Sequence, residues 1–117
     1  MTENQLRVAF IALACRKLPD VKLFVRNVGV FRVEGRAFRA GIRGQADIYG
    51  YERGTGRGIE IELKSSTGRW RPGQQEWRDW CREWGVPWLL LRGTRLESPE
   101  EIVTRWVSEL AAYLEAR

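Results

Sequence analysis

The chain has 117 residues, of which 44% are apolar and 30% are charged. That length suits one domain with one hydrophobic core and leaves no room for a second domain of similar size, so residues 1–117 are interpreted as a single domain. The composition is that of a folded protein rather than a disordered chain. The net charge of +5 favours a polyanionic partner, although a basic surface that serves only solubility explains it equally well.

The sequence contains no histidine. This excludes histidine–metal nucleases, Ser-His-Asp hydrolases and histidine general bases, so catalysis would rest on carboxylates, lysine, tyrosine or cysteine. Cys15 and Cys81 are too few for a closed zinc site and occupy apolar helical contexts, which predicts two buried, reduced thiols. The N-terminus lacks a basic leader and the apolar runs are too short to span a bilayer, so a cytoplasmic or nuclear protein that is not secreted is expected.

The first predicted element is a helix that ends at Pro19, because Thr2 and Gln5 match a capping box and apolar residues then recur with helical spacing. Residues 21–32 are rich in valine and phenylalanine, which predicts a strand that is interrupted near its glycine. Residues 35–44 hold three glycines and three arginines, which is typical of a flexible basic loop.

Two short strands are predicted at 46–51 and 58–63, and the glycines between them favour an antiparallel hairpin. A helix with tryptophans on one face is expected to include Pro72 in its first turn. The apolar run 88–91 predicts a strand at the centre of the sheet, covered on both faces. A final helix begins after a capping box at Ser98. Together these elements predict an α/β protein with one mixed sheet flanked by helices.

The second strand of the predicted hairpin alternates between apolar and polar residues, so Glu60, Glu62 and Lys64 share the face opposite the core. Taken alone, this pattern is typical of a solvated face with an ion pair. Asp47 favours another interpretation, because pairing of the hairpin brings its carboxylate beside Glu62. Two carboxylates suit a divalent cation that polarises a phosphate, and Lys64 could orient water or stabilise negative charge.

Asp47, a gap of 14 residues and then Glu62-Leu63-Lys64 resemble the signature of PD-(D/E)XK nucleases. Ala46 stands where most members have proline, which carries no ligand atom. Across residues 3–92 the flanking motifs follow the order of the virus-type replication-repair nuclease (VRR-NUC) domain: Arg26-Asn27, the glycine-rich run 35–44, Gly58 to Lys64, Gly68-Arg69 and Pro72-Gly73-Gln74.

The resemblance implies a restriction-endonuclease-like PD-(D/E)XK core. It also implies that Asp47 and Glu62 bind Mg²⁺ or Mn²⁺, that the backbone carbonyl of Leu63 completes the coordination, and that Lys64 assists the attacking water.

Two further site residues are implied by the same resemblance. Gln74 would face the site from the start of the second helix, although capping of that helix explains it as well. Glu3 would point toward the metal from the first helix, although the helix dipole alone favours an acidic residue there. Glu60 lies outside the motif and is left as a supporting group.

The predicted function is that of a metal-dependent DNA endonuclease. Phosphate contacts carry no sequence information, so recognition of branched, flapped or junction DNA by shape is expected. The family implies homodimers or higher homo-oligomers and roles in DNA replication and repair, and its name suggests a viral origin. The residues expected to contact DNA are Arg36, Arg39, Arg43, Arg69, Trp70 and Arg71.

Two alternatives compete with the nuclease. The first is a non-catalytic DNA-binding module that uses the same arginines; it is disfavoured because carboxylates that face DNA repel phosphate unless a metal intervenes. The second is an interaction protein that pairs through its tryptophan-lined helix. That pairing does not exclude catalysis, and Trp77, Trp80 and Trp84 are interpreted as core or interface rather than as base-stacking residues.

Overall fold

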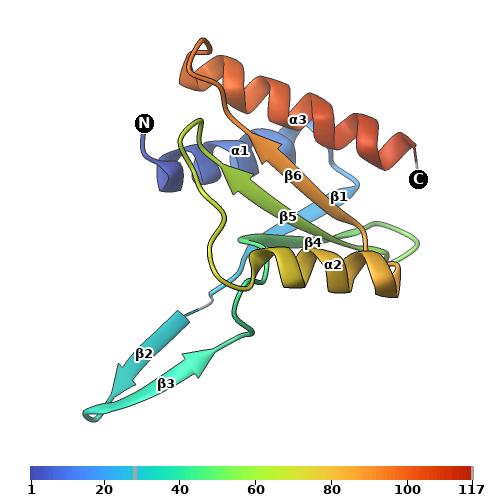
Figure 1. Ribbon diagram of the computed structural model, residues 1–117. Helices are drawn as coiled ribbons and strands as arrows, with labels where there is room; N and C mark the ends of the chain where they lie inside the picture. The colour runs from blue at the N-terminus through green and yellow to red at the C-terminus, as the bar shows by residue number, and fades with distance from the viewer. Residues whose placement is uncertain (28, 117) are drawn as a thin grey trace.

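The computed structural model describes residues 1–27 and 29–116, with side chains described at all of these except 29–31 and 38–40. Figure 1 shows the arrangement of the helices and strands. In chain order they are α1 (Glu3–Lys17), β1 (Val21–Val25), β2 (Gly29–Val33), β3 (Arg36–Ala40), β4 (Ile48–Glu52), β5 (Gly58–Lys64), α2 (Gln74–Trp84), β6 (Trp88–Arg92) and α3 (Pro99–Glu115).

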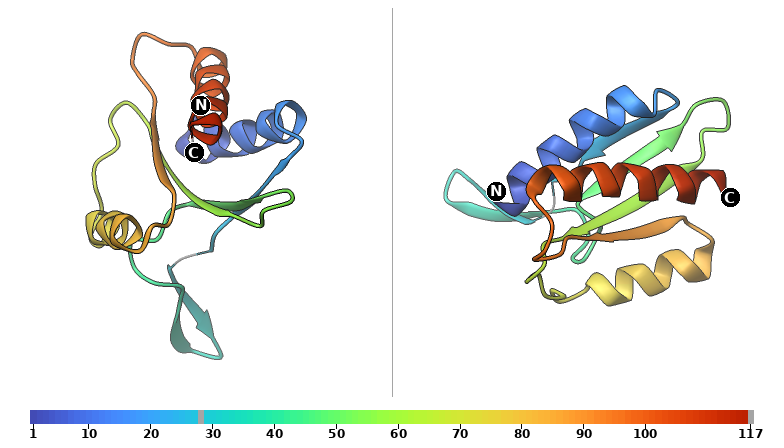
Figure 2. Two further views of the ribbon diagram at one scale, coloured as in Figure 1. Left: turned by 90° about the vertical axis from the view of Figure 1, so that its right-hand side faces the viewer. Right: turned by 90° about the horizontal axis from the view of Figure 1, so that it is seen from above.

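A mixed four-stranded sheet forms the centre of the molecule. Its order is β1-β4-β5-β6, and only the β5–β6 pair is parallel. Helices α1 and α3 lie against one face of this sheet, whereas α2 lies on the other (Figures 1 and 2). This confirms the predicted α/β class with helices on both faces of a mixed sheet. No helix in the described part of the chain is long and apolar enough to cross a membrane.

The hydrophobic core fills the space between the sheet and the pair α1 and α3. The apolar residues of β5 enter it, as their alternation predicts, and meet Phe10 of α1 and Trp106 of α3. These two rings are completely buried and pack edge to face, with centroids 6.0 Å apart. Both helices begin with the capping boxes predicted at Thr2 and Ser98. The core therefore holds β5 rigidly from one side.

The region 21–44 differs from its prediction. The interruption expected near Gly29 is present, but the two parts of the strand belong to different sheets: β1 pairs with β4 in the main sheet, whereas β2 pairs with β3 in a separate ribbon. The prediction of a flexible loop at 35–44 is wrong, since β3 occupies half of that segment. The physical reason is the turn at Glu34-Gly35, where both residues have positive φ angles, of 51° and 76°. A two-residue turn of this kind matches the twist of a hairpin and returns the chain antiparallel.

Three smaller expectations are also corrected. β6 lies at the edge of the sheet rather than at its centre, although α2 and α3 flank its two faces. Pro72 precedes α2, which begins at Gln74 after a cap at Gly73 in the left-handed conformation. Cys15 is exposed, because it lies on the outer side of α1, and only Cys81 is a buried free thiol.

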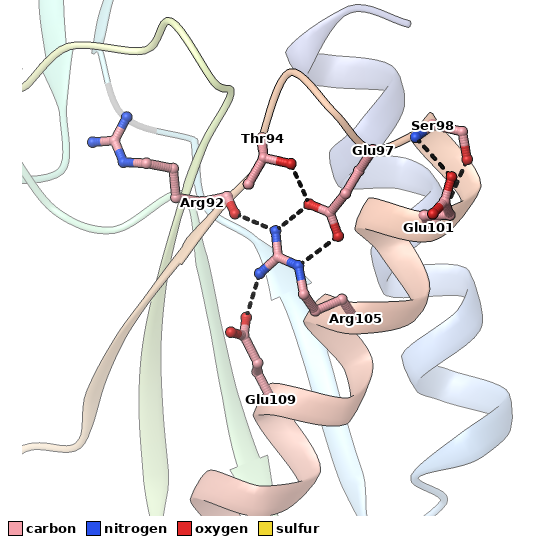
Figure 3. Close-up of polar contacts among 7 residues, drawn as sticks. All are labelled: Arg92, Thr94, Glu97, Ser98, Glu101, Arg105 and Glu109. Carbon is pink, nitrogen blue, oxygen red and sulfur yellow. Dashed lines mark hydrogen bonds and ion pairs between the residues drawn. The ribbon is translucent and has the colours of Figure 1, made fainter.

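Arg105 of α3 anchors the segment that follows β6 (Figure 3). Its guanidinium donates to both carboxylate oxygens of Glu97, each at 2.7 Å, to the carbonyl oxygen of Arg92 at 2.6 Å, and to Glu109 at 3.1 Å. Only a planar fork can serve all of these acceptors together. This network fixes the end of β6 against α3.

The Arg105→Lys protein is expected to unfold at a lower urea concentration than wild type, because an ammonium group cannot replace the bidentate pair with Glu97. Circular dichroism during a urea titration measures the midpoint. Arg16→Lys, at an exposed position of α1, is the control and should keep the wild-type midpoint. Equal midpoints for the two variants would contradict a structural role for the fork.

Candidate active site

The polar residues of β5 are buried. Glu60, Glu62 and Lys64 are only 7%, 2% and 2% exposed, because α2 and the loop before it cover this face of the strand. A solvated polar face is therefore the wrong interpretation. Ionisable groups that are removed from water need hydrogen bonds or opposite charges as partners, and the neighbouring residues of the site supply them.

Asp47 lies beside Glu62. The β4–β5 ladder pairs Ile48 with Ile61, and one further step places residue 47 opposite residue 62. The carboxylate of Asp47 is near enough for its charge to raise the pKa of Glu62. Asp47 was expected inside the strand but immediately precedes β4, where Arg26 N donates to its carbonyl oxygen at 2.8 Å and continues the β1–β4 pairing.

Gln74 connects the two charged residues at the end of β5. Its Oε1 accepts from Lys64 Nζ at 2.6 Å and from the backbone N–H of Arg71 at 2.7 Å, while its Nε2 donates to Glu62 Oε1 at 2.9 Å. Lys64 Nζ also donates to the carbonyl oxygen of Arg69 at 2.8 Å and lies 3.9 Å from Glu62 Oε1. Gln74 thus faces the site, whereas the capping role is not seen: no side chain of the described residues caps the start of α2, and Gln74 bonds the backbone of the preceding turn instead.

Burial changes the protonation of both charged residues. Burial, as the largest cause, and the negative charge of Asp47 together raise the pKa of Glu62 to about 8, although Lys64 acts in the opposite direction. Burial also lowers the pKa of Lys64 below its usual value, although the carboxylate of Glu62 opposes this. Burial is thus the largest cause of both shifts, and it favours the uncharged form of each group.

A hollow of about 250 Å³ opens beside the carboxylates. Glu3 and Asp47 line it together with two cations, Arg7 and Arg71, and with Leu63; Asn4 completes the wall. Glu3 acts on Glu62 only as a weak neighbouring charge. The structure therefore brings Glu3, Asp47, Glu62, Lys64 and Gln74 to one end of β5.

The chemistry of these residues fits a hard divalent cation. Within the described residues, no group of three or more His, Cys, Asp or Glu side chains has an arrangement that would hold a metal. The donors expected here are two carboxylates and a backbone carbonyl, and the two carboxylates do converge. Burial and the neighbouring carboxylate of Asp47 both disfavour ionisation of Glu62, and a divalent cation with a preference for oxygen ligands, such as Mg²⁺ or Mn²⁺, would offset both effects.

The residues expected to contact nucleic acid fall into two places. Arg36 lies on the ribbon and Arg43 follows it, both exposed, whereas the side chain of Arg39 is outside the described residues. Arg69 and Arg71 are exposed in the loop between β5 and α2.

Trp70 belongs to the same loop but is half-buried. Its ring stacks on Trp88 with centroids 6.2 Å apart, and the ammonium of Lys64 lies 5.8 Å from its centroid. Arg78 of α2 approaches the same ring. Trp70 therefore helps to cover Lys64, and its contact with nucleic acid stays a prediction.

Glu60 has a structural partner. Arg26 forms a two-pronged ion pair with its carboxylate, and the indole N–H of Trp77 donates to it at 3.0 Å. Trp80 and Trp84 continue a stack from Trp77 but are 40% and 68% exposed, so they are not core residues. The interface alternative stays open for them.

Three arginines near the site were not recognised from the sequence. Arg7 lines the hollow, and its buried Nε has no hydrogen-bond partner among the described groups. Arg26 neutralises Glu60, and the guanidinium of Arg92 donates to the carbonyl oxygens of Ser65 and Gly68, which fixes the loop after Lys64. Two of them had a sequence signal: Arg7 lies one helical turn after Glu3, on the same side of α1, and Arg26 belongs to the Arg26-Asn27 motif of the resemblance.

The fold and the site together define an α/β protein with a buried carboxylate–lysine cluster at the end of a central strand. Comparison with models of protein families, with curated proteins and with solved structures finds no match.

Proposed function

We propose that this protein is a metal-dependent DNA endonuclease with a PD-(D/E)XK core of the VRR-NUC type. One observation carries the proposal: Asp47 and the buried Glu62 converge beside Lys64, next to a hollow whose wall also holds Arg7 and Arg71. Carboxylates at this point suit a cation, and guanidinium groups beside them suit the phosphate that the cation would accompany.

In this mechanism Asp47 and Glu62 hold Mg²⁺ or Mn²⁺, together with the carbonyl oxygen of Leu63. When bound, the cation would polarise the phosphodiester and lower the pKa of a water molecule beside phosphorus. Lys64 serves as a nearby proton carrier or as a positive charge that stabilises the developing oxyanion. Gln74 fixes the positions of Lys64 and Glu62 relative to each other through one hydrogen bond with each of them.

The substrate is proposed to be branched, flapped or junction DNA, bound as part of DNA replication or repair by a homo-oligomer. Shape recognition follows from arginine contacts to phosphates, which do not distinguish bases. Arg7 and Arg71 would orient the scissile phosphate, while Glu3, which lies one helical turn before Arg7, would contribute a further carboxylate to the hollow.

Cleavage of supercoiled plasmid and of a four-way junction tests the proposal. Wild type is expected to cut in the presence of Mg²⁺ or Mn²⁺ but not in EDTA, and Lys64→Ala should be slower by about 100-fold, because a charge that stabilises the oxyanion is lost. Equal cleavage by both proteins, or cleavage by neither, would refute the mechanism.

Calorimetric titration of Mn²⁺ tests the metal site without a substrate. Wild type should bind the ion, and Asp47→Ala should bind it at least about 10-fold more weakly, because one of two carboxylate ligands is removed. Glu60→Gln is the matched control, since Glu60 lies on the same face but pairs with Arg26. If wild type and Asp47→Ala bound Mn²⁺ equally, the non-catalytic DNA-binding module would become the better interpretation.

A further inference from the structure

The ribbon formed by β2 and β3 stands apart from the rest of the fold. Figures 1 and 2 show it projecting from the body of the molecule. Its two strands pack against each other and, within the described part of the chain, against no other helix or strand. An isolated two-stranded hairpin is only marginally stable in water. A partner outside the chain would stabilise an arm of this kind.

The ribbon carries a concentrated positive charge. Residues 29–44 contain four arginines, Arg32, Arg36, Arg39 and Arg43, against the single carboxylate of Glu34. This short segment therefore accounts for more than half of the net charge of the chain. The side chains of Arg32 and Arg36, on either side of the turn, are exposed. The partner that complements this charge is a polyanion.

The register of the ribbon places its arginines on both faces. Arg32 lies opposite Ala37, and Arg36 lies opposite Val33. Cross-strand partners share a face, and successive positions alternate, so Arg32 and Arg36 lie on opposite faces near the tip. A ribbon that enters a groove with its tip first would present one arginine to each of the two walls.

We propose that the β2–β3 ribbon is an arm that enters the major groove of B-form duplex DNA, with Arg32 and Arg36 contacting phosphates of the two strands. That groove is about 12 Å wide and admits a two-stranded ribbon, whereas the major groove of duplex RNA is deep and narrow. The inference deepens the proposed nuclease function and rests on it for its biological purpose: the arm holds the duplex beside the site.

The ribbon is connected to the site through a backbone contact. Gly44, which follows the ribbon, lies directly against Gly73, and a Cβ atom added at Gly44 would fall 2.1 Å from the carbonyl oxygen of Gly73. Gly73 caps α2 immediately before Gln74, which bonds Lys64 and Glu62. Duplex DNA held by the arm is thereby positioned relative to the carboxylate cluster.

Fluorescence anisotropy with a labelled 20-base-pair DNA duplex, in EDTA to prevent cleavage, tests the arm. Arg32→Ala/Arg36→Ala should bind more weakly than wild type, and the slope of log K against log salt should fall by about 2, because each lost phosphate contact removes roughly 0.9 from it. Glu34→Gln should bind more tightly. The matched control is Arg16→Ala/Lys22→Ala, which loses two exposed charges from α1 and β1 and should change the slope little.

Binding of a 20-base-pair RNA duplex and of single-stranded DNA completes the test. Both should bind more weakly than duplex DNA and respond little to the ribbon substitutions. The inference is overturned if wild type does not bind duplex DNA, if the ribbon variant and the control have the same slope, or if duplex RNA loses as much affinity as duplex DNA.

Cleavage assays on the same proteins separate this inference from the proposed function. If the ribbon variant loses duplex binding but wild type never cleaves DNA with Mg²⁺ or Mn²⁺, the arm stands and the nuclease is refuted. If wild type cleaves and the ribbon variant binds and cleaves equally well, the arm is refuted and the nuclease stands.

Discussion

The Glu62→Gln protein is expected to be more stable than wild type at pH 8 without metal, and to cleave DNA about 1,000-fold more slowly with it. The gain in stability follows from the raised pKa. Glu62 titrates near 8 in the folded protein but near 4.5 in the unfolded chain, so the folded state binds more protons between these values. The contribution of Glu62 to the free energy of unfolding is therefore fully present below pH 4.5 and is lost as the pH rises through 8.

The size of this loss follows from the separation of the two pKa values. One pKa unit corresponds to about 1.4 kcal/mol, so ionisation of Glu62 costs roughly 4 kcal/mol by pH 8. A glutamine has the same shape, accepts the hydrogen bond from Gln74 and donates to Asp47 without this cost. It also removes one of two carboxylate ligands, and the loss of such a charge from a site accounts for the drop in rate.

Thermal unfolding of both proteins at pH 5 and pH 8, in EDTA, checks the prediction. The difference in Tm should be large at pH 8 and small at pH 5, where wild-type Glu62 is mostly protonated. Glu60→Gln is the control on the same face; it should destabilise the protein at both pH values, because it breaks the pair with Arg26. A lower Tm for Glu62→Gln than for wild type at pH 8 would show that ionisation of Glu62 does not destabilise the folded protein.

Mn²⁺ supplies a second readout for the same variant. Because a bound ligand stabilises the folded state, Mn²⁺ should raise the Tm of wild type at pH 8 by more than that of Glu62→Gln.

The Gly44→Ala protein is expected to lose more than about 3 kcal/mol of its free energy of unfolding. Its φ is +89°, and the added Cβ would fall 2.1 Å from both the carbonyl carbon and the carbonyl oxygen of Gly73 and 2.6 Å from the backbone nitrogen of Gln74. These are backbone atoms, so the chain itself has to move. The rate of DNA cleavage should fall as well, because the contact includes the backbone nitrogen of Gln74, whose side chain bonds Lys64 and Glu62.

Gly54→Ala isolates the effect of the contact from the effect of φ. Gly54 has a φ of +86°, but a Cβ there would meet nothing within 4 Å. The Gly54→Ala protein should lose about 1 kcal/mol of its free energy of unfolding, which is the cost of a left-handed conformation for alanine. Urea titration of both variants gives the comparison. Equal free energies of unfolding would mean that the segments of Gly44 and Gly73 do not touch.

The sequence allowed correct prediction of the parts of the site that depend on local patterns. Alternation in β5 placed Glu62 and Lys64 on one face, and the glycine-rich turn brought Asp47 next to Glu62. Capping residues marked the starts of α1 and α3. In each of these cases a short-range rule of strand or helix geometry decides where a side chain points.

The errors concern choices that only long-range packing decides. A run of apolar residues is compatible with a central strand or with an edge strand between two helices, and β6 is the second of these. The burial of Glu60 depends on its ion pair with Arg26, which is distant in the sequence. Likewise, the helical spacing of the tryptophans does not show that Trp84 is exposed to solvent. Arg7 was missed for the same reason, since only the fold places α1 beside Asp47.

The separation of the ribbon from the core has an evolutionary consequence. The described side chains of β2 and β3 contribute nothing to the hydrophobic core. A change in the length or sequence of these strands would therefore cost the domain little stability, since loop closure varies only slowly with length. The carboxylate cluster, by contrast, lies on a strand buried between helices, where most substitutions are costly. The arm can diversify rapidly among descendants of this chain while the chemistry of β5 stays unchanged.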